Sequence, residues 1–344
     1  MMLPYRKFIN PRAKYNFQGR TCSIAAVGSF VPSYVLTNEE LARMVDTSDE
    51  WITSRTGIKE RRIAAKNELT SDLAAKAALK AMAHGRISPE QIDLIIVATI
   101  TPDMPFPSTA CIVQQKIGAH RAAAFDLKAA CSGFIYALEV GQHFIMSHTY
   151  DTVLVIGAEK ISSIINWSDR NTCVLFGDGA GAAILQNRPH SHGLLTVCMG
   201  ADGNKADVLC MPGGGCKIPA SHESLAAGAH FLRMDGRETF KNAVTVMCSA
   251  AQEALRRCNL TPNDIKCIVP HQANRRIIEA VADRLKVSID KFYVNVEKYG
   301  NTSAASVAIA LDEAVHAKRI ERGDVILLVV FGAGFTWGAA VVEW

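Results

Sequence analysis

One cysteine lies where an apolar, strand-like run gives way to an apolar helical segment. Cys131 follows the run at 124–127 and opens the segment 132–141, which is apolar nearly all round a helical surface and is therefore expected to be buried. A thiol at this junction lies at a helix N-terminus, where free backbone N–H groups and the helix dipole favour the nucleophilic thiolate. Packing as a small buried hydrophobe is the alternative for any one of the ten cysteines. The strand-to-helix position distinguishes Cys131 as a candidate nucleophile.

A histidine and an asparagine lie at similar junctions in the second half of the chain. His271 follows the buried run 267–270 and precedes a helical segment, so it lies where open α/β sheets bind ligands. Asn301 heads another apolar helical segment that continues through Ala310. A hydrogen-bonded structural histidine and a helix N-cap are the respective alternatives to a catalytic role.

The two halves of the chain repeat one pattern. Three segments of the first half resemble three of the second in the same order: 93–97, 126–133 and 152–157 resemble 264–269, 295–303 and 324–332. Such a repeat indicates a duplicated α/β unit. Asn301 is then the counterpart of Cys131, and if the halves pack about a pseudo-twofold axis, Cys131, His271 and Asn301 converge on one pocket.

Length and composition describe a folded chain with more than one core. With 344 residues, 49% of them hydrophobic and 20% charged, the chain is too long for one growing core and too apolar for disorder. The alternation of short apolar runs with helical segments, such as 72–83 and 237–258, predicts an α/β fold. Ser71 is the candidate N-cap of the first of these helices. We expect a basic extension at 1–20, an N-terminal half at 21–190 and a C-terminal half at 191–344.

Charge is concentrated at the start of the chain. The first 20 residues contain five basic residues and no acid, which leaves 32 basic and 33 acidic residues in the rest. The extension is either a disordered tail or an organelle-targeting segment. Without a concentrated basic face, we do not expect nucleic-acid binding.

Cysteine spacing and one long apolar stretch bear on the compartment. No two cysteines form a C-x-x-C pair, so we expect neither disulfides nor zinc, and reduced cytoplasm is the expected location. The uncharged stretch 325–342 is long enough to suggest a membrane span, but Gly332, Gly334 and Gly338 divide it. We expect two buried strands joined by a turn, and no membrane association.

A stretch of weak periodicity runs from Gly200 to Asp235. Loops of this length are usually lids or binding loops, and a mobile surface insertion is the alternative.

Several motifs, taken in order, resemble β-ketoacyl-acyl-carrier-protein synthase III from about Thr21 to Trp344. They are DEWI at 49–52, RTG at 55–57, AACSG at 129–133, FGDGA at 176–180, VPHQAN at 269–274, GNTSAAS at 300–306 and FGAGFTWG at 331–338. The resemblance implies a thiolase-like, five-layered αβαβα fold built from two βαβαβαββ halves. It also implies a homodimer, a Cys-His-Asn site, and neither metal nor cofactor beyond the coenzyme A (CoA) thioester.

The resemblance assigns roles to the three candidate residues. Cys131 would accept an acyl group from acetyl-CoA or another short acyl-CoA. His271 and Asn301 would bind the thioester carbonyl of malonyl-acyl carrier protein (malonyl-ACP) as it loses carbon dioxide, because negative charge then develops on that oxygen. The backbone N–H groups of Cys131 and Ala333 would form an oxyanion hole for the acyl-transfer intermediate. Fatty acid synthesis would begin with the β-ketoacyl-ACP formed.

Further positions match binding residues of the family. Trp51 and Arg170 match residues that stack the adenine of CoA, and Arg55 matches one that contacts its phosphates. Arg276 and Lys241 match basic residues that meet the acidic carrier protein. For these cations, an ordinary solvated surface is the alternative. Phe106 matches a residue that crosses the dimer interface and closes the acyl pocket.

Four other functions were weighed against this one. A related acyltransferase or condensing enzyme of secondary metabolism shares the same fold. A thiolase proper needs a second catalytic cysteine, and a hydroxymethylglutaryl-CoA synthase needs a catalytic glutamate; the motifs show neither. A non-catalytic acyl-CoA or acyl-ACP binding module would have lost its nucleophile first, yet Cys131 is present. The sequence leaves primer length and branching open.

Overall fold

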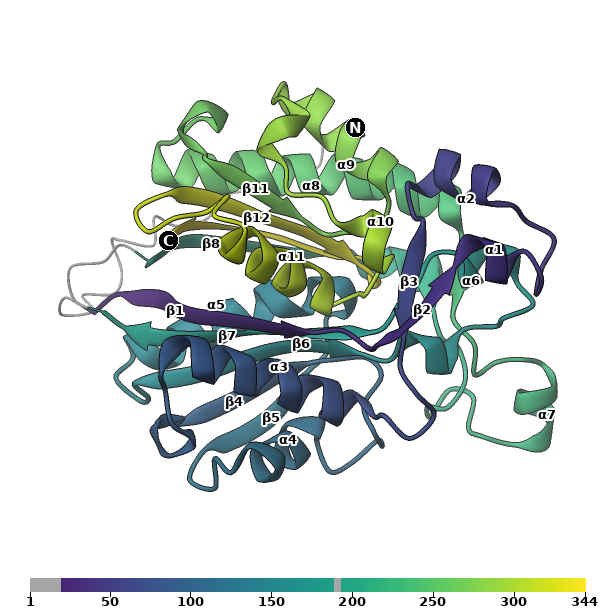
Figure 1. Cartoon of the computed structure of the whole chain (residues 1–344), viewed down its shortest axis with the longest axis horizontal. Coiled ribbons are helices and arrows are strands. Elements are labelled where there is room, and N and C mark those ends of the chain that lie inside the picture. Colours follow the sequence, from purple (N-terminus) through teal and green to yellow (C-terminus); the bar gives the residue numbers. More distant parts are fainter. Residues whose placement is uncertain (1–19, 189–192) are drawn as a thin grey trace.

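Two β-sheets form the framework of the protein (Figure 1). The computed structural model describes residues 20–188 and 193–344, so the expected basic extension lies outside the described residues except for Arg20. Every strand of the first sheet comes from residues 22–187, and every strand of the second comes from residues 193–343.

The first sheet has five strands. Their order is β1 (Cys22–Phe30), β7 (Gly179–Asn187), β6 (Thr152–Glu159), β4 (Leu94–Ala98) and β5 (Ala123–Leu127). The strands β6, β4 and β5 are mutually parallel, and β7 runs antiparallel to both of its neighbours. β4 is buried along its whole length, as expected for a parallel strand covered on both faces.

The second sheet repeats this order with one strand fewer. Its strands are β8 (Gly193–Ala201), β13 (Thr336–Glu343), β12 (Val325–Gly332) and β11 (Cys267–Pro270). Where the first sheet continues to β5, the described residues of the second half form only an isolated parallel bridge between Ile268 and Phe292. β12 and β13 form an antiparallel pair, which confirms that the long apolar stretch is two strands and a turn.

Helices cover both sheets and separate them, which gives the five layers that the resemblance implies (Figure 1). Two helices, α5 (Gly133–Met146) and α11 (Ala305–His316), form the central layer and contact both sheets. Two layers lie outside: α3 (Thr70–Gly85) and α4 (Thr109–Ile117) on the first sheet, and α8 (Gly236–Cys258) and α9 (Arg275–Leu285) outside the second.

Glycines let the central helix α11 approach the first sheet closely. A Cβ on Gly157 of β6 would lie 2.3 Å from the carbonyl oxygen of Ala304, and one on Gly181 of β7 would lie 2.5 Å from the Cβ of Ala308. Neither distance is compatible with a side chain. The N-terminus of α11 is therefore held directly above the end of β6.

The outer helices follow the predicted periodicity, but one predicted cap is wrong. The N-cap position of α3 is Leu69, and α3 begins at Thr70. Ser71 lies inside the first turn, where its hydroxyl donates to Asp103. A tertiary acceptor thus takes the side chain that the local pattern assigns to capping.

Shorter elements join the layers. The antiparallel strands β2 (Tyr34–Thr37) and β3 (Glu60–Ile63) pair with each other. The short helices are α1 (Asn38–Leu41), α2 (Asp49–Thr56), α6 (Arg170–Cys173) and α10 (Val296–Tyr299). The stretch Gly200 to Asp235 contains the strands β9 (Leu209–Cys210) and β10 (Arg233–Met234) and the helix α7 (His222–Ala226). In the described part of the chain, no helix is long and apolar enough to cross a membrane.

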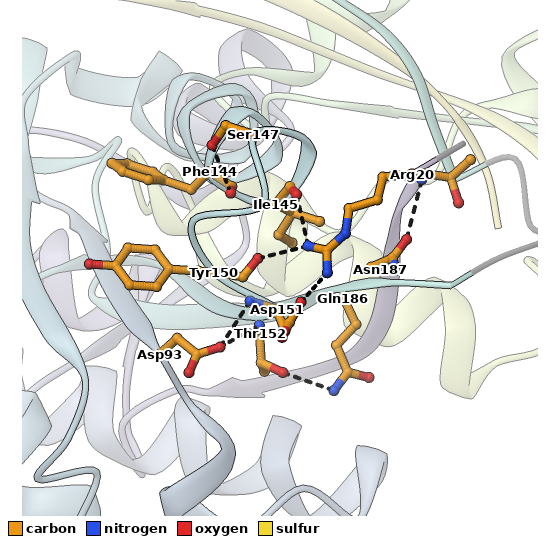
Figure 2. Close-up of polar contacts among 11 residues, drawn as sticks. Arg20, Asp93, Phe144, Ile145, Ser147, Tyr150, Asp151, Thr152, Gln186 and Asn187 are labelled. Atoms are coloured by element: carbon orange, nitrogen blue, oxygen red, sulfur yellow. Dashed lines mark hydrogen bonds and ion pairs between the residues drawn. The ribbon is translucent and has the colours of Figure 1, made fainter. Parts of the chain in front are cut away.

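Arg20 belongs to the folded body rather than to a free extension (Figure 2). Its guanidinium donates to the carbonyl oxygen of Ile145 at 3.0 Å and pairs with the carboxylate of Asp151. Ile145 lies in the last turn of α5, whose exposed carbonyls favour a cation. The helix that begins beside Cys131 is thus stabilised at its other end by a charge from the start of the described chain.

Candidate active site

Cys131, His271 and Asn301 line one cavity of about 650 Å³. Cys131 also lines a second, apolar cavity of about 190 Å³. Two segments supply much of its lining. Ile161 and Ile164 follow β6, and Leu209, Met211 and Leu232 lie in or next to β9 and β10. The stretch Gly200 to Asp235 therefore forms a wall of the site, as the binding-loop interpretation predicts.

Cys131 lies in a 3₁₀ turn, Ala130–Ser132, that leads directly into α5. Ala130 adopts the left-handed region at φ 46°, so the chain turns sharply between β5 and the helix. The side chain is buried, and burial raises the pKa of the thiol to about 12. Its Sγ lies 3.4 Å from the hydroxyl oxygen of Ser303. At neutral pH the resting group is a thiol that must lose its proton to react.

His271 is a neutral hydrogen-bond donor in this environment. Complete burial lowers the pKa of its imidazole to about 3. Its Nδ1 lies 2.6 Å from the hydroxyl oxygen of Ser306, and the same oxygen accepts a hydrogen bond from the backbone N–H of Gln272 at 3.4 Å. The Ser306 hydroxyl can donate to Nδ1 or accept from it, so this contact holds the ring in place in either tautomer.

Asn301 is held by the backbone of a neighbouring segment. Its N–H donates to the carbonyl of Leu175, and its carbonyl accepts from Gly177. The side-chain Oδ1 accepts from the N–H of Ser303 at 2.8 Å, so the Nδ2 amino group is the donor that remains for a ligand in the cavity. The helix-cap alternative is wrong, because the N-cap position of α11 is Ala304.

The end of β12 brings a second backbone segment to Cys131. A Cβ on Gly332 would lie 2.8 Å from the backbone nitrogen of Cys131. Ala333, the next residue, lines the apolar cavity together with Cys131. The two residues whose N–H groups the resemblance assigns to an oxyanion hole therefore border the same space.

Aromatic and guanidinium groups meet at the mouth of the larger cavity. The guanidinium carbons of Arg55 and Arg170 lie 4.6 and 4.8 Å from the centre of the Trp51 ring. Arg170 also donates to the backbone carbonyl of Asp46 at 2.7 Å. Arg170 therefore lies directly on the indole ring, and a planar group could enter between them only if the guanidinium moved aside.

The other predicted cations lie on or beside the rim. Arg276 lines the cavity, with its guanidinium carbon 5.9 Å from the Phe240 ring, whereas Lys241 is exposed on α8 and is not among the lining residues. Arg237, which the sequence analysis does not single out, also lines the cavity. The rim is therefore basic and the interior is uncharged.

Phe106 lies apart from the other predicted residues. Its side chain is 83% exposed, and it lines neither cavity of its own chain.

Three residues that the sequence analysis does not assign lie in the site. Ser303 and Ser306 fall within a recognised motif, so their presence near Asn301 follows from their position in the sequence. Glu159 ends the apolar strand β6, and its carboxylate bonds to Ser303 at 3.1 Å. In the sequence, the one indication of a functional residue at this position is that a charged residue ends an otherwise apolar run.

None of the ten cysteines forms a disulfide. In residues 20–188 and 193–344, no cluster of three or more His, Cys, Asp or Glu side chains could hold a metal ion.

Two family models match the chain. Residues 125–203 match 3-oxoacyl-[acyl-carrier-protein (ACP)] synthase III, and residues 255–344 match the C-terminal model of the same family. The chain is 58% identical over 321 residues to the β-ketoacyl-[acyl-carrier-protein] synthase III of Caldanaerobacter subterraneus subsp. tengcongensis, which covers 93% of this chain and 97% of that protein. The corresponding protein of Clostridioides difficile is 51% identical over 321 residues, with 93% and 98% coverage.

Solved structures agree with this result. The 3-oxoacyl-[acyl-carrier-protein] synthase III of Aquifex aeolicus superposes with a TM-score of 0.87 at 46% identity, covering 94% of this chain and all (100%) of that one. The priming β-ketosynthase of the R1128 polyketide pathway superposes equally well, at 0.87, with 36% identity and coverage of 94% and 96%.

Replacing Gly332 by alanine should slow acylation of the cysteine. The added Cβ would force the end of β12 away from the backbone N–H of Cys131, and loss of one such donor costs about 100-fold or more in rate. Intact-mass spectrometry after mixing with acetyl-CoA measures the single-turnover rate.

Gly203→Ala is the matched control, because a Cβ at Gly203 would meet nothing within 4 Å. Acylation of Gly332→Ala at the wild-type rate would show that the two segments tolerate separation, and the oxyanion-hole assignment would be withdrawn.

Proposed function

The chain belongs to the β-ketoacyl-[acyl-carrier-protein] synthase III family, which condenses an acyl-CoA with malonyl-ACP to initiate fatty acid synthesis, and we propose how its own residues divide that reaction. The protein is an acyltransferase. The convergence of Cys131, His271 and Asn301 on one cavity supports this division of roles most directly.

In the first half-reaction, the Cys131 thiolate attacks the thioester carbonyl of a short acyl-CoA. The N-terminus of α5 favours the thiolate, and the backbone N–H groups of Cys131 and Ala333 stabilise the tetrahedral oxyanion. CoA leaves, and the acyl chain occupies the apolar cavity of about 190 Å³, whose volume suits a chain of few carbons.

In the second half-reaction, malonyl-ACP enters the larger cavity and loses carbon dioxide. The negative charge that develops on its thioester oxygen is stabilised by Nε2–H of His271 and Nδ2–H of Asn301. Both donors are neutral and held in place by Ser306 and Ser303, so little reorganisation is needed as the charge forms. The resulting carbanion attacks the acyl-Cys131 thioester, which gives β-ketoacyl-ACP and frees the thiol.

Substitution of the donors should separate the two half-reactions. Asn301→Ala should retain much of its acylation by acetyl-CoA but lose malonyl-ACP decarboxylation by about 100- to 1000-fold, because only the second step uses the side-chain donor. His271→Ala should behave likewise, and Cys131→Ser should remain unacylated. Mass gain and release of labelled carbon dioxide, measured on the same preparations, provide the test.

Three results would contradict this division. Carbon dioxide release from Asn301→Ala at the wild-type rate would remove Asn301 from the mechanism. Acylation mapped to Cys111 or Cys173 instead of Cys131 would overturn the nucleophile, and no acylation of the wild type at all would leave a binding module.

The basic rim suits both substrates. In this proposal Arg55 contacts the phosphates of CoA, the adenine enters between Trp51 and Arg170 once the guanidinium moves aside, and Arg276 and Lys241 meet the acidic carrier protein. The β-ketoacyl-[acyl-carrier-protein] synthases III that the chain resembles are bacterial enzymes, which supports a cytoplasmic site of action.

Charge reversal at Arg276 or Lys241 should raise the KM for malonyl-ACP and weaken its salt dependence, while acylation by acetyl-CoA changes little. The carrier docks outside the cavity through screened charge pairs, whereas acyl transfer occurs inside. Steady-state kinetics at two salt concentrations and single-turnover acylation measure the two effects. An equal loss in both half-reactions would indicate a shared CoA site instead.

We further propose that the protein is a homodimer joined at the edge strand β5. This strand is open on one side and partly exposed, and its sequence AAFDL offers little charge against edge pairing. An exposed Phe106 that lines no cavity of its own chain supports a role in the partner's acyl pocket.

Ala123→Lys, which places a charge on the β5 edge, should convert the dimer to a monomer of 37.3 kDa. Leu79→Lys is the control, because Leu79 is also an exposed apolar residue but lies on the outer helix α3. Multi-angle light scattering measures the mass. A monomeric wild-type protein would contradict the proposal.

A further inference from the structure

Glu159 is a buried carboxylate that the mechanism above does not use. It ends strand β6 and is 0% exposed. Five neighbouring groups contact it, and none of them is charged. They are the hydroxyls of Thr99, Thr101 and Ser303 and the backbone N–H groups of Ile100 and Thr101.

The hydrogen-bond directions around Glu159 are determined by its neighbours. The Thr99 hydroxyl oxygen accepts from the N–H of Thr101, and the Thr101 hydroxyl oxygen accepts from the N–H of Lys160. Both hydroxyl hydrogens are therefore free to point at the carboxylate, as the two N–H groups do. The surroundings of Glu159 consist of donors, so it is built to be an acceptor.

Ser303 connects this carboxylate to the nucleophile. Its hydroxyl lies 3.1 Å from Oε1 of Glu159 and 3.4 Å from Sγ of Cys131. Ser303 adopts φ 51°, and these two contacts place its hydroxyl between the carboxylate and the thiol. Because its hydrogen is directed to the carboxylate, the hydroxyl oxygen is left to accept from the thiol.

We propose that Ser303 and Glu159 form a proton relay that takes the thiol proton of Cys131 during acylation and returns it after condensation. Ser303 contacts the reacting sulfur, and Glu159 acts through Ser303. This inference rests on the proposed function, since it concerns how the acyl-Cys131 intermediate forms and breaks.

The relay balances across both half-reactions. As Sγ attacks the acyl-CoA carbonyl, the S–H bond breaks and its electron pair remains on sulfur; the proton passes to Ser303 Oγ while the Ser303 proton passes to Glu159 Oε1. CoA leaves as a thiolate and takes a proton from solvent. When the carbanion from malonyl-ACP displaces Cys131, the thiolate regains its proton from Glu159 through Ser303.

The neighbouring imidazole is a weaker base than the carboxylate. The pKa of His271 is lowered to about 3, whereas burial raises the pKa of Glu159 to about 7. An ionised Glu159 also raises the pKa of Cys131, so the two groups disfavour being anionic together. Transfer of one proton between them leaves the buried charge unchanged, and no additional charge is desolvated.

The test uses single-turnover acylation by acetyl-CoA across pH 5.5 to 9.5, with carbon dioxide release from malonyl-ACP on the same preparations. Ser303→Ala should slow acylation by about 100-fold or more, because it removes the proton path while leaving the carboxylate in place. Glu159→Gln should slow it similarly. Once Ser303→Ala and Glu159→Gln have been acylated, their rates of carbon dioxide release should differ from the wild-type rate by less than about threefold, because decarboxylation uses His271 and Asn301.

The pH profile distinguishes a relay from a structural role. In the wild type, the rate should fall as the pH falls through about 7, because protonation of Glu159 removes the acceptor. Ser303→Ala should lose this inflection and accelerate steadily with pH. Among the described groups in contact with Glu159 or Ser303, only Cys131 also titrates, and the amine of the adjacent Lys160 is bound to the carbonyls of Ala65 and Glu68.

Ser132→Ala is the matched control. It removes a buried hydroxyl next to Cys131 that has no hydrogen-bond partner in the described structure, so acylation should be unchanged. Wild-type acylation with an unchanged inflection in Ser303→Ala would overturn the relay while leaving the acyl-Cys131 mechanism intact. Failure of the wild type itself to be acylated would instead overturn the proposed function.

Discussion

The site depends on the packing of one helix between two sheets. The backbone at the start of α11 lies so close to β6 that a side chain at Gly157 would overlap Ala304, and Gly181 is similarly restricted by Ala308. This contact carries the segment 301–304 to the carboxyl end of the first sheet, where the turn that holds Cys131 leads into α5. The proposed nucleophile from one half and its polar partners from the other meet because the two glycines place no side chain between the layers at this point.

Burial then decides which protonation states the interior can hold. The same desolvation raises the pKa of Cys131, lowers that of His271 and raises that of Glu159. Neutral donors such as the imidazole and the amide suit a reaction in which negative charge appears briefly on a thioester oxygen, because burying them carries no desolvation cost of an isolated ion. The cations that line the cavity, Arg55, Arg237 and Arg276, are exposed at its rim.

Local patterns and tertiary contacts contributed differently to what could be predicted. The predicted buried run 267–270 coincides with β11, and the stretch 325–342 forms β12 and β13, because burial makes these strands continuous apolar runs. Ser71 was assigned as a cap from its immediate neighbours, and Asp103, more than thirty residues away, takes its hydroxyl instead. Asn301 was a candidate cap for the same local reason, whereas its bonds join it to Leu175 and Ser303.

The sequence by itself determined the family, the α/β pattern and the three candidate residues, because motif order and apolar periodicity are properties of the chain that need no neighbours. Only the tertiary structure decided the contact of His271 with Ser306, the wall formed by the stretch Gly200 to Asp235, and the connection from Cys131 through Ser303 to Glu159. Glu159 and Ser303 are separated by 144 positions. Proton affinity and hydrogen-bond direction depend on desolvation and on which groups meet in space, and folding alone brings such distant residues into contact.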